Sequence, residues 1–263
     1  MEHTPLNEMR NKIATFTENE LLSSGKISSA KEKIKPAQFS AVGNTDILYR
    51  KKLALFCSVK CPGNIIVQTY DAIKALRDAG IIVIGGFHSP IEKECLNILL
   101  RGPQPVIICP ARSIAGMRIK PEHKKPLEEG RLLFLSPFSE RDKRISAKRA
   151  DVRNHFVASA ADAFFIAYAA PGSKTEKFCY EITKQGKVVF TIMHDANRNL
   201  LSFGVKGVSI DNLIQSLLDN TFRGELVPQD PNDEPASELL KRLSTVQNTS
   251  KKNPINKMCK RKK

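Results

Sequence analysis

The sequence predicts an α/β fold of the Rossmann-like, doubly wound type, in which a mainly parallel sheet carries helices on both faces. Three observations predict it. From Lys52 onward, apolar runs alternate regularly with helical patterns. The apolar runs are continuous, as in strands that are covered on both faces. The links between runs and helical patterns are short, which is typical of strand–helix units wound around one sheet.

Six apolar runs are expected to be strands. They are KLALFCS (52–58), IIVIGGF (81–87), PVIICPA (105–111), RLLFLSPF (131–138), DAFFIAYA (162–169) and KVVFTI (187–192). Helical patterns follow at residues 64–80, 89–102, 123–130, 145–161, 173–186 and 211–220. Gly80 and Gly186 are signals for helix ends, and Ser89 with Pro90 is a signal for a helix start.

Composition divides the chain into three parts. Residues 45–222 contain the α/β domain, residues 1–44 are interpreted as an N-terminal helical arm, and residues 223–263 are interpreted as a flexible basic tail. The net charge is +15, of which residues 241–263 carry +9 without any acidic residue. A basic domain combined with a basic tail favours a polyanionic partner.

The composition also argues against several classes of protein. No apolar run approaches the roughly 18 to 20 residues of a membrane span, and the N-terminus lacks the apolar core of an export signal. The six cysteines include no CxxC pair and do not have zinc-site spacing, so we expect buried, reduced thiols and no metal. These features predict a cytoplasmic protein with no membrane partner and no cofactor.

Four turns at the ends of expected strands combine small residues, hydroxyls and cations. In a parallel sheet the ligand crevice lies at the carboxyl ends of the strands. N–H groups and the dipole at a helix start favour an anion, and small residues let a phosphate approach the backbone. Tight turns and helix caps would explain one such turn alone, but the set favours a phosphate-binding rim. The ligands predicted from these turns are Ser58, Lys60, Gly85, Gly86, His88, Arg112, Gly172, Ser173, Lys174 and Thr175.

Two familiar phosphate-binding fingerprints are absent. The turn PGSKT (171–175) lacks the leading glycine of GxxxxGK[ST], which argues against a P-loop nucleotidase. No GxGxxG follows the first strand, which argues against a dinucleotide-dependent oxidoreductase.

Residues 141–155 (RDKRISAKRADVRNH) contain six Lys or Arg and two acids. A solvated helix face would explain this charge without a ligand. Beside a phosphate rim, the stretch is interpreted as a track for a nucleic-acid backbone. Phe87, Phe138 and His155 are the candidates to stack on bases.

Enzymatic motifs are missing from the sequence. No GxSxG or HExxH occurs, and Glu176 and Glu181 are the only plausible general bases near PGSKT. We therefore expect a binding protein and no catalytic residue.

Taken together, several segments resemble the DprA/Smf family of DNA-processing proteins, which belongs with the LOG enzymes to a wider group of Rossmann-like domains. LALFCSVKCPG is similar to the family's first strand and its Gly-Ser-Arg turn, and IIVIGGFHSPIE to its Ser-Gly-Leu-Ala-x-Gly-Ile-Asp stretch. RNHFVASAAD (153–162) is similar to the family's Arg-Asn-Arg motif, and LLFLSPF to its returning strand. The resemblance covers residues 47 to 195. Cys57 and Val59 depart from the family's Gly and Arg, Lys60 stands in for the Arg, and Pro90 and Glu92 replace Gly and Asp.

The resemblance implies a single-stranded-DNA-binding protein that acts in DNA processing and recombination, helps to load a recombinase and often forms a homodimer. By position it adds Arg153 and Asn154 to the nucleotide-binding residues. Two alternatives remain open at this point. In the first alternative, the protein is a sensor whose crevice holds a nucleotide-derived ligand. In the second, it is a LOG-like nucleoside-phosphate hydrolase.

Overall fold

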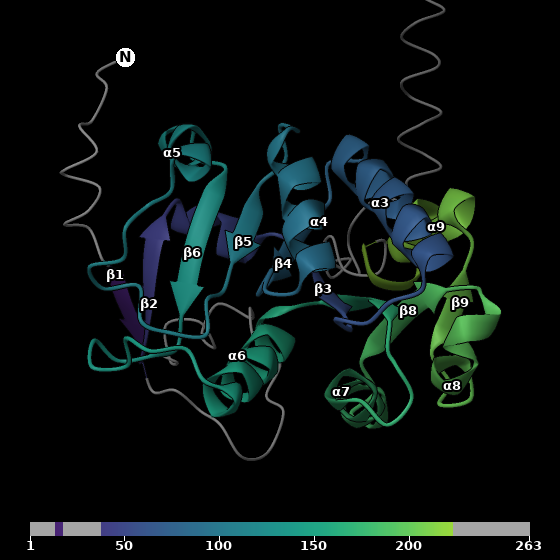
Figure 1. The fold of residues 1–263 in the computed structure, drawn as a ribbon. Helices are drawn as coiled ribbons and strands as arrows, with labels where there is room; N and C mark the ends of the chain where they lie inside the picture. The colour runs from purple at the N-terminus through teal and green to yellow at the C-terminus, as the bar shows by residue number, and fades with distance from the viewer. Residues whose placement is uncertain (1–13, 18–37, 223–263) are drawn as a thin grey trace, which may run out of the picture. The chain divides into compact units, whose positions relative to one another are not determined.

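A nine-stranded sheet organises residues 14–17 and 38–222, which are the residues that the computed structural model describes (Figure 1). The strands are β1 (Ala14–Thr17), β2 (Gln38–Gly43), β3 (Lys52–Cys57), β4 (Ile82–Gly85), β5 (Val106–Ile108), β6 (Leu132–Ser136), β7 (Ala163–Tyr168), β8 (Val188–Ile192) and β9 (Lys206–Val208). Their order is β1-β2-β6-β5-β4-β3-β7-β8-β9. All neighbours from β6 to β9 are parallel, whereas β1–β2 and β2–β6 are antiparallel.

Helices cover both faces of this sheet (Figure 1). One face carries α3 (Gly63–Asp78), α4 (Pro90–Leu100), α5 (Pro121–Glu128) and α9 (Ile210–Leu217). The other face carries α6 (Ala147–Ala160), α7 (Lys174–Lys184) and the short α8 (Arg198–Leu201). Among the residues described, no helix combines the length and apolarity needed to cross a lipid bilayer.

The central strands are buried on both faces, and the doubly wound, mainly parallel fold predicted from the sequence is confirmed. Every residue of β3 and β7 is buried. Phe164 packs into the core on one face and its neighbour Phe165 into the core on the other. Burying such a side chain contributes roughly 1.5 to 3 kcal/mol, so the apolar runs supply much of the driving force for folding. The six strands and six helices expected between residues 52 and 220 are all present.

The ends of the chain differ from the prediction or lie beyond the described residues. Residues 1–44 were expected to form a helical arm, but in the part described they contribute β1 and β2. β2 pairs with β6, Ser40 opposite Ser136, and extends the sheet with antiparallel strands. The chain divides into two units, 1–224 and 225–263, and the basic tail expected at 223–263 lies outside the described residues. The strand β9 and helix α8 were not predicted.

A buried lysine marks the start of β3, at the edge of the sheet opposite the strand ends discussed below. Lys52 is 4% exposed, and burial lowers its pKa. Its Nζ donates to the carbonyl of Arg50 and lies 3.6 Å from the carboxylate of Asp162. The same carboxylate accepts the Lys52 N–H at 2.9 Å.

Replacing Asp162 with alanine should therefore lower the free energy of unfolding by about 1 to 3 kcal/mol, because the buried ammonium of Lys52 loses its counter-ion and the Lys52 N–H loses its acceptor. Urea denaturation measures the change. Asp71→Ala, which removes an exposed carboxylate paired with Lys74, is the control and should change stability by less than about 0.5 kcal/mol. Equal losses in the two variants would contradict the role assigned to Asp162.

Candidate nucleic-acid interface

The strand order creates a switch point between β3 and β7, at the centre of the sheet. From β3 the chain crosses through α3 to β4 on one side, and from β7 it crosses through α7 to β8 on the other. The two helices lie on opposite faces, so the loops after β3 and β7 diverge (Figure 1). In open α/β sheets a crevice forms at such a point, beyond the carboxyl ends of the strands.

The turns singled out in the sequence all lie at this edge. They follow β3, β4, β5 and β7, which are parallel neighbours in one sheet. The prediction that the four turns share one rim is confirmed. Whether each of their residues contacts a ligand stays a prediction, and the surroundings of each residue are described below.

Two serines join the loops that meet at the switch point. The Ser58 hydroxyl accepts the Ala170 N–H at 3.1 Å and lies 3.4 Å from the Ser173 hydroxyl. The Ser173 hydroxyl accepts the Glu176 N–H at 3.1 Å and so caps α7. Only one of the two hydroxyl hydrogens can lie between the serines. The other has no acceptor among the residues described, and it can donate to an anion.

Exposed positive charge flanks this pair of serines. Lys60 follows β3, Lys174 begins α7, and both side chains are exposed. Neither ammonium forms an ion pair within the described ranges. Thr175, half-buried, is the next residue of α7, and the N-termini of α3 and α7 both point to this edge. The helix dipoles add positive potential there.

One predicted donor at the switch point is already occupied. The N–H of Gly172 donates to the carboxylate of Glu176 at 2.6 Å. The other carboxylate oxygen of Glu176 accepts from Asn199, whose side chain also donates to the carbonyl of Ala169. Gly172 has a φ of +72°, which suits glycine and makes the turn tight. Glu176 therefore holds this turn in place, and Gly172 provides the backbone conformation that the turn requires.

A second carboxylate fills the turn after β4. Glu92 is 7% exposed, and one of its oxygens accepts the Cys57 N–H at 3.0 Å. Its other oxygen accepts the N–H groups of His88 at 2.9 Å and Ser89 at 3.2 Å. This corrects the expectation that the turn after β4 offers free amides to a phosphate. The carboxylate of Glu92 occupies the N–H groups that a phosphate would otherwise bind.

A buried arginine lies against the same turn. Arg153 is 6% exposed, and its Nη1 donates to the carbonyl of Cys109 at 3.1 Å. Its Nε donates to Asn154 at 2.8 Å, so Asn154 is also engaged within the protein. Burial lowers the pKa of Arg153, while the negative charge of Glu92 opposes that shift. A Cβ added to Gly86 would lie 1.2 Å from Nη1, so the guanidinium lies directly over this glycine.

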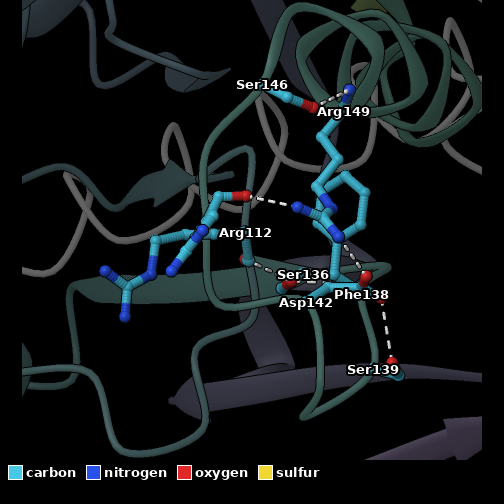
Figure 2. A network of polar contacts seen from close by, with 8 residues as sticks. Arg112, Ser136, Phe138, Ser139, Asp142, Ser146 and Arg149 are labelled. Carbon is cyan, nitrogen blue, oxygen red and sulfur yellow. Dashed lines mark hydrogen bonds and ion pairs between the residues drawn. The ribbon is translucent and has the colours of Figure 1, made fainter.

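The remaining predicted residues are distributed along the edge. Gly85 is buried, where a Cβ would come within 3.3 Å of the Phe87 ring. His88 is exposed. Arg112 is half-buried; its Nε donates to the carbonyl of Ser113 at 3.2 Å, and its own carbonyl accepts from the Ser136 hydroxyl at 2.9 Å (Figure 2).

Two of the three aromatic candidates for base stacking are buried. Phe87 and Phe138 are 5% and 8% exposed, so neither ring offers a face to a base. His155 packs edge-on against Phe178 and lies 3.3 Å from the carboxylate of Glu181. The cysteines that the structure describes are free thiols, and the described residues contain no group of side chains suited to a metal ion.

Glu92 is the organising residue that the sequence reasoning missed. In the sequence it stands out only as a departure from the family pattern. The signal that identifies it is the pair Ser89 and Glu92, three residues apart at the start of a helix, which is the spacing of a capping box. The structure shows that capping box, with Ser89 accepting the Glu92 N–H at 3.2 Å.

Comparison with known proteins places this arrangement among known folds. No protein-family model matches the chain. DprA from Streptococcus pneumoniae is similar in structure, with a TM-score of 0.63, 19% identity, and coverage of 82% of this chain and 77% of that one. DprA from Helicobacter pylori, whose structure concerns single-stranded DNA binding, has a TM-score of 0.61 and 22% identity, over 72% of this chain and 91% of that one. At these identities the likeness shows a shared fold, which confirms the fold that the family resemblance implied.

A separate sequence match is short. The specificity subunit of the Escherichia coli type I restriction enzyme EcoAI is 64% identical over 36 residues, which are 14% of this chain and 6% of that subunit. The corresponding EcoEI subunit matches to a similar extent, with 63% identity over 35 residues. The chain thus matches only a small part of these curated relatives.

Proposed function

We propose that this chain is a DprA-like protein that binds single-stranded DNA through its phosphates and acts in DNA processing or recombination. The observation that carries the proposal is the switch point between β3 and β7. The turns that meet there carry two exposed lysines, a hydroxyl hydrogen with no acceptor among the described residues, and two helix N-termini. The fold is that of DprA, and the Helicobacter pylori protein is described by its mode of binding single-stranded DNA. Backbone contacts of this kind give affinity with little sequence preference.

The proposal is of a binding protein, not an enzyme. Glu176, the carboxylate closest in sequence to the serines, already accepts from Gly172 and Asn199. By the same family resemblance, we infer a recombinase and a second copy of this chain as partners.

The test is binding of a fluorescent oligothymidine to the full chain across a range of salt concentrations. Lys60→Ala and Lys174→Ala should each reduce the slope of log affinity against log salt by about 0.7, the value for one phosphate contact to a single strand. Lys125→Ala is a matched control, because Lys125 is exposed and lies in the last turn of α5, just before the start of β6 and so near the other edge of the sheet. Its slope should not change.

Two results would overturn the proposal. One is a wild-type protein that fails to bind the oligonucleotide at low salt. The other is a thermal stabilisation by mononucleotides without any by DNA, which would favour the sensor of a nucleotide-derived ligand. Release of free base from a nucleoside monophosphate would favour the hydrolase.

A further inference from the structure

The connection between β6 and α6 is a second basic feature at the same edge of the sheet. We call residues 139–149, which are most of this connection and the first three residues of α6, the basic loop. It contains five Lys or Arg, namely Arg141, Lys143, Arg144, Lys148 and Arg149, together with the acids Glu140 and Asp142. The proposed function does not use it, because the predicted ligands around the switch point lie on other turns.

Asp142 fastens this loop to the fold (Figure 2). Its carboxylate accepts from the Ser139 hydroxyl at 2.9 Å and from the guanidinium of Arg149. Its backbone carbonyl accepts the Ser113 N–H at 2.9 Å, which ties the loop to the turn after β5. The second terminal nitrogen of Arg149 donates to the carbonyl of Arg144 at 2.6 Å. The loop therefore has a fixed shape and position next to Arg112.

Most of the positive charge of the basic loop is not paired with an acidic side chain of the described residues. Arg149 offsets Asp142, while the side chains of Arg141, Lys143, Arg144 and Lys148 are exposed. None of these four forms an ion pair with another described residue. Glu140, exposed, is the acid that remains in the loop. The basic loop thus carries four exposed cations on a backbone that its hydrogen bonds hold in place.

The stretch between the basic loop and the switch point offers little to a phosphate. The turn after β4 lies between them, and there Glu92 occupies the N–H groups of His88 and Ser89. Arg153, which the family resemblance suggested as a ligand, lies against this turn, but it is buried over Gly86. Along the described part of this edge, the exposed lysine and arginine side chains therefore fall into two separate groups.

We propose that the basic loop, together with Arg112, is a second contact for the phosphates of the same DNA strand that occupies the switch point. This rests on the proposed function. β6 and β7 are four strand spacings apart in the sheet, about 19 Å at about 4.8 Å per spacing. A strand stacked at about 3.4 Å per nucleotide crosses that distance in about six nucleotides. Short oligonucleotides reach one region only, and longer ones reach both.

The test compares oligothymidines of four and twelve nucleotides on the full chain. In the double variant Arg144→Ala/Lys148→Ala, affinity for the twelve-nucleotide strand should fall at least tenfold, and its salt slope should shrink by about 1.4 for two lost contacts. Affinity for the four-nucleotide strand should stay within twofold. The charge-matched control Lys124→Ala/Lys125→Ala, on the exposed face of α5, should leave both unchanged.

An equal loss for both lengths would overturn the second contact, since it would indicate a general effect of net charge. No loss for either length would overturn it as well. Failure of the wild-type protein to bind any oligonucleotide is a different result, because it removes the proposed function itself. Lys60→Ala gives a further distinction, since it should weaken binding of both lengths if the switch point is the primary site.

Discussion

Replacing Glu92 with alanine is expected to lower the free energy of unfolding by about 3 to 5 kcal/mol, because buried donors left without an acceptor cost roughly 1 to 3 kcal/mol each. The carboxylate accepts three backbone N–H groups, from Cys57, His88 and Ser89, and all three would lose their acceptor. Arg153 would also lose the negative charge that opposes the effect of burial on its pKa. Denaturant unfolding measures the change, and the melting temperature should fall by roughly 6 to 20 °C.

Two companion variants make this result specific to the Glu92 carboxylate. Glu92→Gln keeps the shape and one acceptor oxygen, so its loss should be smaller than that of the alanine variant. Glu94→Ala, on the same helix, removes a carboxylate whose contact is with Asn97 near the surface, and it should cost less than about 0.5 kcal/mol. A Glu92→Ala loss below about 1 kcal/mol would show that these N–H groups do not depend on the carboxylate.

Replacing Glu92 should also affect the edge of the sheet at which we propose that DNA binds. The Cys57 N–H sits at the end of β3, one residue before Ser58 and three before Lys60. Without its acceptor, this loop is no longer fixed to the turn after β4. Oligonucleotide affinity should therefore fall even though removal of an acidic residue raises the net positive charge of the protein.

Replacing Gly86 with alanine is the second large expected effect, about 3 kcal/mol of lost stability. The new Cβ would lie 1.2 Å from Nη1 of Arg153 and 2.0 Å from its Cζ. The guanidinium can avoid the methyl group only by leaving the carbonyl of Cys109, and it is enclosed by protein. Overpacking and the loss of a hydrogen bond to a charged group each cost about 1 to 3 kcal/mol.

A double-mutant cycle checks that the clash with Arg153 is the cause. The double variant Gly86→Ala/Arg153→Ala should be about as stable as Arg153→Ala alone, because no guanidinium remains to be displaced. Gly63→Ala is the control, since a Cβ added there would meet nothing within 4 Å and the φ of Gly63 is negative. Additive losses in the cycle would mean that the alanine disturbs something other than Arg153.

Sequence pattern alone identified the elements that bury apolar surface. Continuous apolar runs such as DAFFIAYA can be satisfied only between two layers of helices, so they predict a parallel sheet. The strands β2 and β9 escaped this reasoning because neither QFSAVG nor KGV contains a continuous apolar run. β2 forms because its backbone pairs with β6, which lies nearly one hundred residues away in sequence, and local pattern carries no trace of that pairing.

The rim of turns was likewise determined by the sequence, because parallel strands place their carboxyl ends together whatever their order. Which cations remain available on that rim was decided only by the tertiary structure. Lys174 and Arg153 look equally suitable in the sequence, yet Lys174 is exposed and Arg153 is buried over Gly86. The physical reason is that burial depends on what packs across the sheet. Glu92 shows the same dependence, because its three N–H partners come together only when β3 and β4 lie side by side.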